Sequence, residues 1–274
     1  MIEVKDLRKS FDGVEVLKGI TTTFETGKVN LVIGQSGSGK TVFLKSLLNV
    51  YEPTSGHILF DGRDIVGMSR QEKEALRAEI GTVFQGSALF DSMTVQDNIM
   101  FPLDMFTNLT FTEKKKRVKE VIGRVHLENA EKKFPSEISG GMQKRVAIAR
   151  AIVNNPRYLF CDEPNSGLDP FTANIIDDLI AEITEEYNTT TIINSHDMNS
   201  VMTIGEKIVY LRKGIKEWEG TKDILITSDN NYLIDFVYSS ELFKELREYL
   251  IKINKTSIDN IITTVENETD QENT

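Results

Sequence analysis

The segment Gly-Gln-Ser-Gly-Ser-Gly-Lys-Thr at residues 34–41 has the residue types and spacing of a phosphate-binding loop. It follows an apolar run at residues 28–33 that predicts a buried strand, and it precedes an apolar-faced helix predicted over residues 41–48. Glycines allow backbone angles at which successive N–H groups converge on phosphate oxygens at a helix N-terminus. The predicted phosphate-binding residues are Gly34, Gln35, Ser36, Gly37, Ser38, Gly39, Lys40 and Thr41.

The last two residues of this phosphate loop carry the most specific chemistry. Lys40 is placed to reach the β- and γ-phosphates of a nucleotide, and Thr41 offers a hydroxyl to Mg²⁺. An ordinary tight turn between a strand and a helix is the alternative, but such a turn needs neither residue at these offsets. The loop therefore predicts a nucleoside triphosphate site with Mg²⁺.

Two adjacent carboxylates, Asp162 and Glu163, end a second apolar run at residues 158–161. Neighbouring positions on a strand point in different directions, so the two side chains are expected to have different roles. We predict that Asp162 holds the Mg²⁺ shell and that Glu163 orients or deprotonates an attacking water, a contribution of about 10²–10⁴ in rate. The alternative is a solvated acidic end of a strand.

A third motif, Ser139, Gly140 and Gly141, precedes a helical pattern over residues 142–153 and makes a second N-terminus that could bind an anion. One subunit does not need two phosphate cradles for one nucleotide. By these motifs the chain resembles the ATP-binding subunits of ABC transporters. The resemblance implies that this signature, residues 139–141, faces the γ-phosphate held by the phosphate loop of a partner in a head-to-tail homodimer.

Four more positions match that family one by one. Phe11 matches the aromatic residue that stacks on adenine, and Gln85 matches the glutamine that links the γ-phosphate and Mg²⁺ to the helical subdomain. Asp169 matches the aspartate of the D-loop, residues 165–169, and His196 matches the switch histidine that contacts the γ-phosphate. Taken singly, Phe11 could be a core residue, Gln85 and Asp169 polar loop residues, and His196 a capping side chain.

The resemblance therefore implies a set of roles that divides into three groups. Catalysis is expected to involve Lys40, Gln85, Glu163 and His196, and the metal shell Thr41, Gln85 and Asp162. Phe11, the phosphate loop, the signature and Asp169 are expected to hold ATP. The cofactors implied are ATP and Mg²⁺.

Departures from the usual family pattern narrow the resemblance. Met142, Asn165 and Gly167 stand where the family more often has glutamine, threonine and alanine. With SALFDSMTVQDNI, GLDP and SHDM, the chain looks most like the ATPase of Mla-type phospholipid transporters, which maintain outer-membrane lipid asymmetry and include the toluene-tolerance systems. The alternatives are the ATPase of an amino-acid or other small-solute importer and a soluble ABC protein that drives a scaffold, as in iron–sulfur assembly, or a translation factor.

The same resemblance implies the fold class, an α/β P-loop NTPase of the ABC ATPase kind. It comprises a RecA-like core, an antiparallel β subdomain and a helical signature subdomain. We expect an ATP-binding domain over residues 1–237 with its helical subdomain at about residues 86–150. An amphipathic helical extension is expected over residues 238–262 and an acidic disordered tail over residues 263–274.

Composition limits the partners and the location. The 274 residues, 39% hydrophobic and 27% charged, are typical of a globular protein, and no apolar stretch approaches the roughly 18 residues that cross a bilayer. A net charge of −10 argues against nucleic-acid binding and against adhesion to anionic lipid by charge alone. With no secretory signal at its start, the chain is expected in the cytoplasm, on the inner membrane only through a permease.

Local patterns predict further elements. Ser69 with Glu72, and Thr110 with Glu113, match the capping box at the start of a helix. A hairpin is expected to turn at residues 213–214, and Cys161, the single cysteine, is expected to be a small buried residue.

The C-terminal part of the chain has one apolar pattern after the motifs end. Leu242, Leu246, Leu250 and Ile253 recur at helical spacing and predict an amphipathic helix over residues 241–254. This helix could pack on its own domain or on a partner subunit, and the spacing alone leaves both options open.

Overall fold

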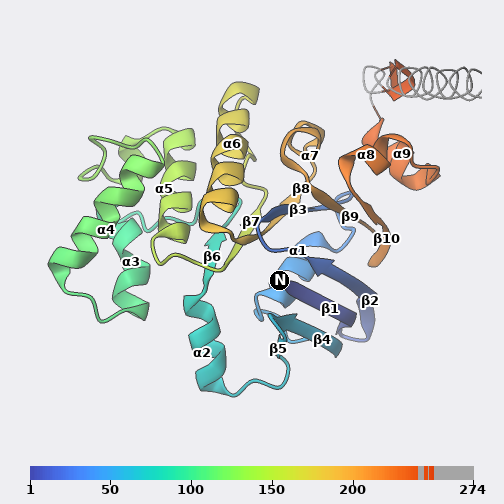
Figure 1. Ribbon diagram of the computed structural model, residues 1–274, viewed down its shortest axis with the longest axis horizontal. Helices are drawn as coiled ribbons and strands as arrows, with labels where there is room; N and C mark the ends of the chain where they lie inside the picture. The colour runs from blue at the N-terminus through green and yellow to red at the C-terminus, as the bar shows by residue number, and fades with distance from the viewer. Residues whose placement is uncertain (240–243, 246, 250–274) are drawn as a thin grey trace, which may run out of the picture. The chain divides into compact units, whose positions relative to one another are not determined.

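The computed structural model in Figure 1 describes residues 1–239, 244–245 and 247–249. The chain divides into two units, Met1–Glu219 and Gly220–Thr274, which are described separately. The predicted helix over residues 241–254 lies outside the described residues except for residues 244–245 and 247–249, which are helical. The predicted tail over residues 263–274 lies outside them entirely, and the predicted domain boundaries stay predictions.

A six-stranded sheet, in the order β10-β9-β3-β8-β7-β6, carries the predicted chemistry. Its strands are β3 (Lys28–Ile33), β6 (Ile80–Val83), β7 (Tyr158–Asp162), β8 (Thr190–Ser195), β9 (Lys207–Arg212) and β10 (Ile215–Gly220). The pairs β9–β3, β3–β8, β8–β7 and β7–β6 are parallel. The central strands are continuous buried runs because both faces of the sheet are covered, one of them by α1 and the second sheet. The predicted strands at residues 28–33 and 158–161 are confirmed.

The second sheet is antiparallel, in the order β2-β1-β4-β5. Its strands are β1 (Ile2–Phe11), β2 (Val14–Phe24), β4 (Ser55–Phe60) and β5 (Arg63–Asp64). The turns Asp12-Gly13 and Asp61-Gly62 both have positive φ at each residue, which suits the twist of a tight hairpin. The predicted hairpin at Lys213-Gly214 is confirmed by β9 and β10 and has the same backbone geometry.

One hydrophobic core fills the space between the two sheets. It joins buried side chains of β1, β2 and β4 to side chains of β3, β7, β8 and β9, and helix α1 (Lys40–Leu47) adds Phe43, Leu44 and Leu47. Figure 1 shows α1 between the sheets. The helix that begins at the phosphate loop is therefore anchored by core packing at its apolar face. Cys161 is free and buried, as predicted.

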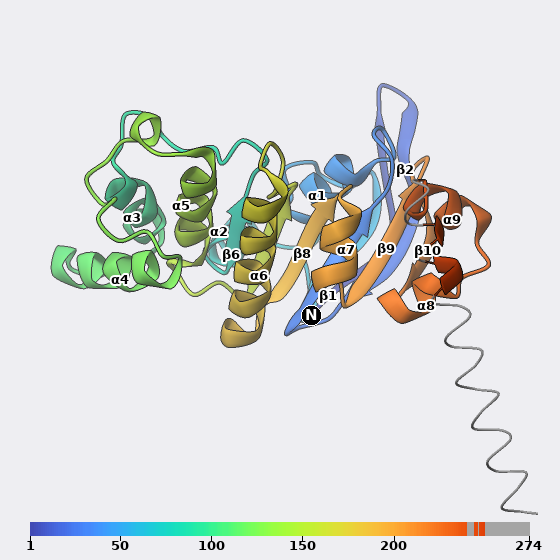
Figure 2. The same ribbon diagram turned by 90° about the horizontal axis from the view of Figure 1, so that it is seen from above.

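Helices α3 (Val95–Phe106), α4 (Phe111–Arg124) and α5 (Gly140–Ile152), with the short helix η1 (Pro135–Glu137), form a separate helical group. In Figures 1 and 2, α5 lies between the other helices of this group and α6 (Pro170–Tyr187). The remaining helices are α2 (Arg70–Ala78), α7 (Met198–Ile204), α8 (Lys222–Ile226) and α9 (Asn231–Val237). The capping boxes predicted at Ser69 and Thr110 are both present. Parallel sheet, antiparallel sheet and helical group together confirm the predicted fold class.

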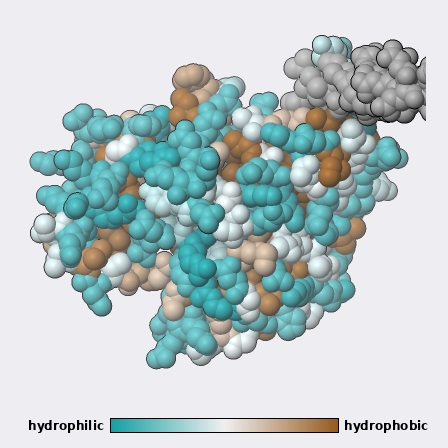
Figure 3. Space-filling model, in the orientation of Figure 1, coloured by the Kyte–Doolittle hydropathy of each residue, from teal (hydrophilic) through white to brown (hydrophobic). Residues whose placement is uncertain are grey.

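The surface agrees with the acidic composition. The face shown in Figure 3 is mainly hydrophilic, with hydrophobic atoms in scattered small groups. Within the described part of the chain, no helix has both the length and the hydropathy needed to cross a bilayer.

Helix α5 approaches strand β6 closely at Gly81. A Cβ built on Gly81 would lie 2.3 Å from the carbonyl oxygen of Ala151, although the backbone there has no positive φ. We expect Gly81→Ala to push α5 from the sheet and to lower the free energy of unfolding by about 1–3 kcal/mol, measured by urea denaturation. Gly123→Ala in α4 meets nothing within 4 Å and should be neutral or slightly stabilising. Equal stabilities of the two variants would contradict this packing.

Candidate active site

The predicted catalytic residues follow the carboxyl ends of neighbouring parallel strands. β3 leads into the phosphate loop, β7 ends at Asp162, β8 ends one residue before His196, and β6 ends two residues before Gln85. In the hydrogen-bond register, Val32 pairs with Asn194, which pairs with Asp162. Because the ends of parallel strands meet at one edge of a sheet, the fold brings these four segments together.

The phosphate loop has the backbone that an anion cradle requires. Gly34, Gly37 and Gly39 have φ of 151°, 77° and 108°. A Cβ on Gly34 would lie 2.3 Å from the carbonyl oxygen of Leu211, so a larger residue would not fit there. Gly39, the N-cap of helix α1, offers no side-chain cap, and the buried Oγ of Ser38 has no hydrogen-bond partner within the described residues. These unmet groups fit a bound phosphate.

Lys40 lies folded onto the phosphate loop. Its Nζ donates to the carbonyl oxygens of Gly34, at 2.6 Å, and Gln35, at 3.2 Å. Burial lowers the pKa of the ammonium, and the carboxylates of Glu163 and Asp162 oppose that shift. Lys40 is therefore within electrostatic reach of both strand-end carboxylates, as expected of a group that shares one site with them.

Glu163 is held in an unusual backbone conformation. Its φ of +47° lies in the left-handed region, which costs a residue other than glycine about 1–3 kcal/mol unless its surroundings fix it there. The N–H of Glu163 donates to the carbonyl oxygen of Asn194 at 3.0 Å. Its Oε1 lies 3.1 Å from Nδ1 of His196, whose side chain is 63% exposed. The structure thus pairs the predicted base with the predicted switch histidine.

Asp162 is positioned by a residue that the sequence motifs did not include. The side-chain Nδ2 of Asn194, fully buried in β8, donates to Oδ1 of Asp162 at 3.0 Å. Asn194 directly follows the apolar pair Ile192-Ile193, and a polar residue at the end of such a run is the signal that could have identified it. Among the described residues, no three His, Cys, Asp or Glu side chains converge as a metal site. A Mg²⁺ shell of one carboxylate, a threonine hydroxyl and substrate phosphates fits this arrangement.

Gln85 is held from two directions. Its Nε2 donates to Oγ of Ser166 in the D-loop at 3.1 Å, and its backbone carbonyl accepts from Nζ of Lys144. Burial lowers the pKa of Lys144, while Cys161 and Glu163 raise it. Lys144 was not predicted from the sequence. The helix sequence is basic at this point, which indicates exposure, so the sequence did not predict that Lys144 is buried.

The signature lies apart from the phosphate loop of its own chain. Ser139 caps α5, where its Oγ accepts from the N–H of Met142 at 3.3 Å, and a Cβ on Gly141 would lie 2.8 Å from Thr172. Thr172 is in turn bound by Asp169, which caps α6 through the backbone N–H, at 3.0 Å, and the hydroxyl. A Cβ on Gly39 would instead approach β2 and the β9–β10 turn. The structure therefore brings the signature to the D-loop and not to the phosphate loop.

Phe11 ends β1 at the surface. Its ring is 36% exposed and meets Tyr51 edge to face, with ring centroids 5.1 Å apart. Nζ of Lys9 lies 4.8 Å from the ring centroid. Phe11 thus belongs to a small surface cluster and not to the core. Its adenine-stacking role stays a prediction.

The chain matches a known protein family and is similar to named members of it. A family model described as "ABC transporter" matches residues 17–166. The chain is 39% identical to "Probable ribonucleotide transport ATP-binding protein mkl" of Mycobacterium bovis over 86% of this chain and 66% of that protein, slightly less than two thirds of its length. It is 38% identical to "Methionine import ATP-binding protein MetN 2" of Oceanobacillus iheyensis over 80% of this chain and 65% of that protein.

Solved structures of an ABC transporter cassette are also similar to this chain. The dimeric ABC transporter cassette MJ0796 matches with a TM-score of 0.74 and 32% identity, over 81% of this chain and 98% of that chain. Another structure of the same cassette is a dimer in a post-hydrolysis state with bound ADP and Pi, at 31% identity.

The pairing of Glu163 with His196 generates a direct test. We expect Glu163→Gln to lower ATP turnover at least 100-fold, because glutamine keeps the side-chain shape and loses the base, while ATP affinity changes less than threefold. Steady-state phosphate release and binding of a fluorescent ATP analogue measure the two effects. Glu185→Gln, an exposed change on α6, is the matched control and should behave as the wild type. Near-normal ATP turnover of Glu163→Gln would show that Glu163 is not a catalytic residue.

Proposed function

The chain belongs to the ABC transporter family, and we propose that it is the subunit that powers a membrane permease for phospholipids. As an ABC cassette, it uses ATP with Mg²⁺ and hydrolyses ATP. The observation that carries the energy-coupling part of this proposal is the meeting of the phosphate loop, Asp162, Glu163 and His196 at one edge of the parallel sheet, with Glu163 and His196 3.1 Å apart.

Hydrolysis in this site divides among the chain's own residues. Lys40 would leave the loop carbonyls to bind the β- and γ-phosphates, and Thr41, Gln85 and Asp162 would hold Mg²⁺, which neutralises charge on the transferred phosphate. Glu163 would orient the attacking water and accept its proton. His196, hydrogen bonded to Glu163, would bind the γ-phosphate and keep the carboxylate aimed at the water.

The second half of each site would come from another copy of the chain. Ser139 and Gly140 are exposed at the start of α5, and a Cβ on Gly140 would lie 3.9 Å from the side chain of Leu168 in the D-loop of the same chain. A cradle of this kind needs an external phosphate, and the dimeric cassette that this chain resembles supports a homodimer. Two MgATP would then lie between the phosphate loop of one subunit and the signature of the other.

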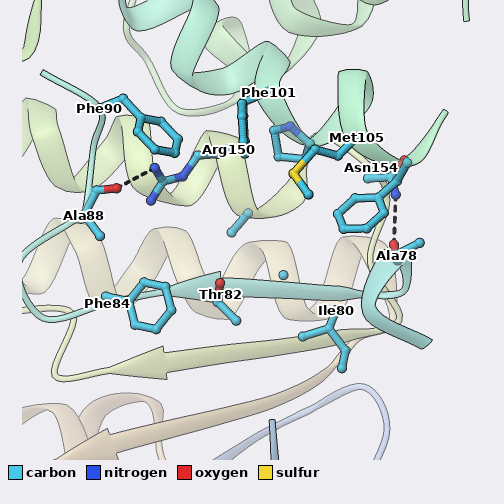
Figure 4. A pocket seen from close by; sticks show the side chains of 14 residues that line it. Ala78, Ile80, Thr82, Phe84, Ala88, Phe90, Phe101, Met105, Arg150 and Asn154 are labelled. Carbon is cyan, nitrogen blue, oxygen red and sulfur yellow. Dashed lines mark hydrogen bonds between the residues drawn. The ribbon is translucent and has the colours of Figure 1, made fainter. Parts of the chain in front are cut away.

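A groove next to Gln85 is the proposed contact with the permease. Its volume is about 260 Å³, and it is lined by the edge strand β6, the C-terminal half of α3 and the end of α5. Figure 4 shows Ile80 and Thr82 of β6, with Phe84 just beyond the strand, on one wall, and Phe101 and Met105 facing them. Met105 is 59% exposed. Exposed apolar side chains around a half-open groove suit a short helix of a membrane partner.

The proposed cargo is phospholipid, and the membrane would be the bacterial inner membrane, with the chain on its cytoplasmic face. Support comes from Met142 and from the SALFDSMTVQDNI, GLDP and SHDM segments, which resemble Mla-type ATPases. The relatives are named for other cargo, "probable ribonucleotide transport" and "methionine import", so a small-solute importer is the main alternative. A soluble ABC protein acting on a scaffold is the alternative that needs no membrane.

A site shared between two subunits predicts different effects on ATP binding and dimerisation for two variants. Lys40→Ala should weaken ATP binding to the monomer at least tenfold, because Lys40 acts within its own loop. Ser139→Arg should leave that affinity within threefold and abolish ATP-driven dimerisation and turnover, because arginine would block closure. Binding is measured by fluorescence and dimerisation by light scattering. Ser136→Arg, an exposed change three residues earlier, is the control. Equal loss of monomer affinity in both variants would rule out the shared site.

Cargo and partner are tested together by purification from membranes. The tagged chain, extracted in mild detergent, should co-purify with a multi-spanning permease whose complex retains phospholipid and moves labelled phospholipid between vesicles with ATP. Met105→Glu should reduce co-purification at least fivefold, because a charge would line the groove, whereas Val66→Glu, exposed in the other sheet region, should not. ATP-driven uptake of a small solute without lipid movement would favour the importer, and survival of the complex without membranes would favour the scaffold.

A further inference from the structure

Helix α6 buries a carboxylate beside the segment that follows Glu163. Asp177 is 2% exposed, and its Oδ1 accepts from Nδ2 of Asn165 at 2.6 Å. The same Nδ2 lies 3.2 Å from Oγ of Ser200 in α7, and Ser200 is 1% exposed. Ser200 is also hydrogen bonded to Asp177. We call these three residues the Asn165 cluster.

The Asn165 cluster is costly as a purely structural element. Burial raises the pKa of Asp177, Ser200 and Asn165 oppose the shift through hydrogen bonds, and the nearby carboxylates Asp197 and Asp178 add to it. The two groups that donate to the carboxylate are neutral, and among the described residues no cation is identified that offsets the cost of burying it. An apolar side chain of similar size would pack between α6 and α7 with less penalty. This cost motivates the search for a role of the cluster beyond stability.

The position of the cluster indicates that role. Asn165 is two residues after Glu163 and directly precedes Ser166, the hydrogen-bond partner of Gln85. Ser200 is in the helix that begins two residues after His196. The amide of Asn165 therefore joins the segment of Glu163 to the segment of His196 through contacts that are largely shielded from water.

We propose that the Asn165 cluster is a positioning device that fixes Glu163 against His196 for hydrolysis. Asn165 and Asp177 are positioning residues, since they act through Glu163 and have no place in the phosphate cradle. Glu163 holds a left-handed backbone with φ of +47°, which persists only where its surroundings over-determine it. Asn165 anchors the chain just beyond that point. This inference rests on the proposed roles of Glu163 and His196.

Release of the anchor has a defined consequence. Without the Asn165 amide, Glu163 can relax towards ordinary backbone angles, and its carboxylate moves away from His196. Water attack would then slow, while the phosphate loop, which lies on β3 and α1, would keep its affinity for ATP. The expected signature is a fall in kcat with little change in KM.

A charge exchange within the cluster tests the proposal. Asn165→Asp places a second carboxylate against Asp177, and Asp177→Asn faces one amide with another. We expect each single change to lower kcat at least tenfold with KM for ATP within threefold. The double variant Asn165→Asp/Asp177→Asn restores one carboxylate and one amide in reversed order, and it should recover at least half of the lost kcat. Asn174→Asp, an exposed change on the same helix, is the control.

The milder variant Ser200→Ala covers the case in which Asn165→Asp does not fold, as judged by thermal melting. It adds no charge and should lower kcat about threefold with KM unchanged. Wild-type kcat in folded Asn165→Asp or Ser200→Ala, or a folded double variant without recovery, overturns the proposal. If Glu163→Gln abolishes turnover while these variants do not, the positioning role alone fails. If Glu163→Gln retains turnover, the assigned role of Glu163 fails first.

Discussion

The parallel hydrogen-bond register of β3, β8, β7 and β6 is the constraint on which the site depends. It fixes Val32, Asn194 and Asp162 in one row, so that the segments beyond them begin at the same edge. Each segment then adds one kind of group: amides and Lys40 after β3, carboxylates after β7, an imidazole after β8 and an amide side chain after β6. A slip of one residue in β7 would turn Asp162 to the other face of the sheet.

The sequence predicted those features whose signals are local. The glycine and lysine spacing at residues 34–41, the apolar runs of β3 and β7, the two capping boxes and the turn at residues 213–214 each depend on neighbours in the chain. The parts that could not be predicted join distant segments. Lys144 reaches the Gln85 carbonyl across 59 positions, and Asn194 reaches Asp162 across 32. Their residue types are common on surfaces, and only tertiary packing shows their burial.

The phosphate loop and the signature lie on different parts of the fold. The phosphate loop is built on the sheet, whereas the signature is built on α5 and packs against the D-loop of the same chain. Asp169 therefore has a structural duty, capping α6, in addition to the nucleotide contact proposed for it. Because of this coupling, a movement of the signature beside the D-loop or of Glu163 before it would be transmitted to the D-loop.

Helix α5 is a rigid element that makes different contacts at its two ends. Its 13 residues span about 20 Å, with the signature at the first turn and Arg150 near the last. Arg150 donates to the carbonyl oxygens of Ser87 and Ala88 at 2.7 Å each, and it lines the groove beside Gln85. Because a helix bends little over fewer than four turns, a displacement of the groove end must appear at the signature end. Mechanical force could thus pass along one helix, with no change in its internal hydrogen bonds.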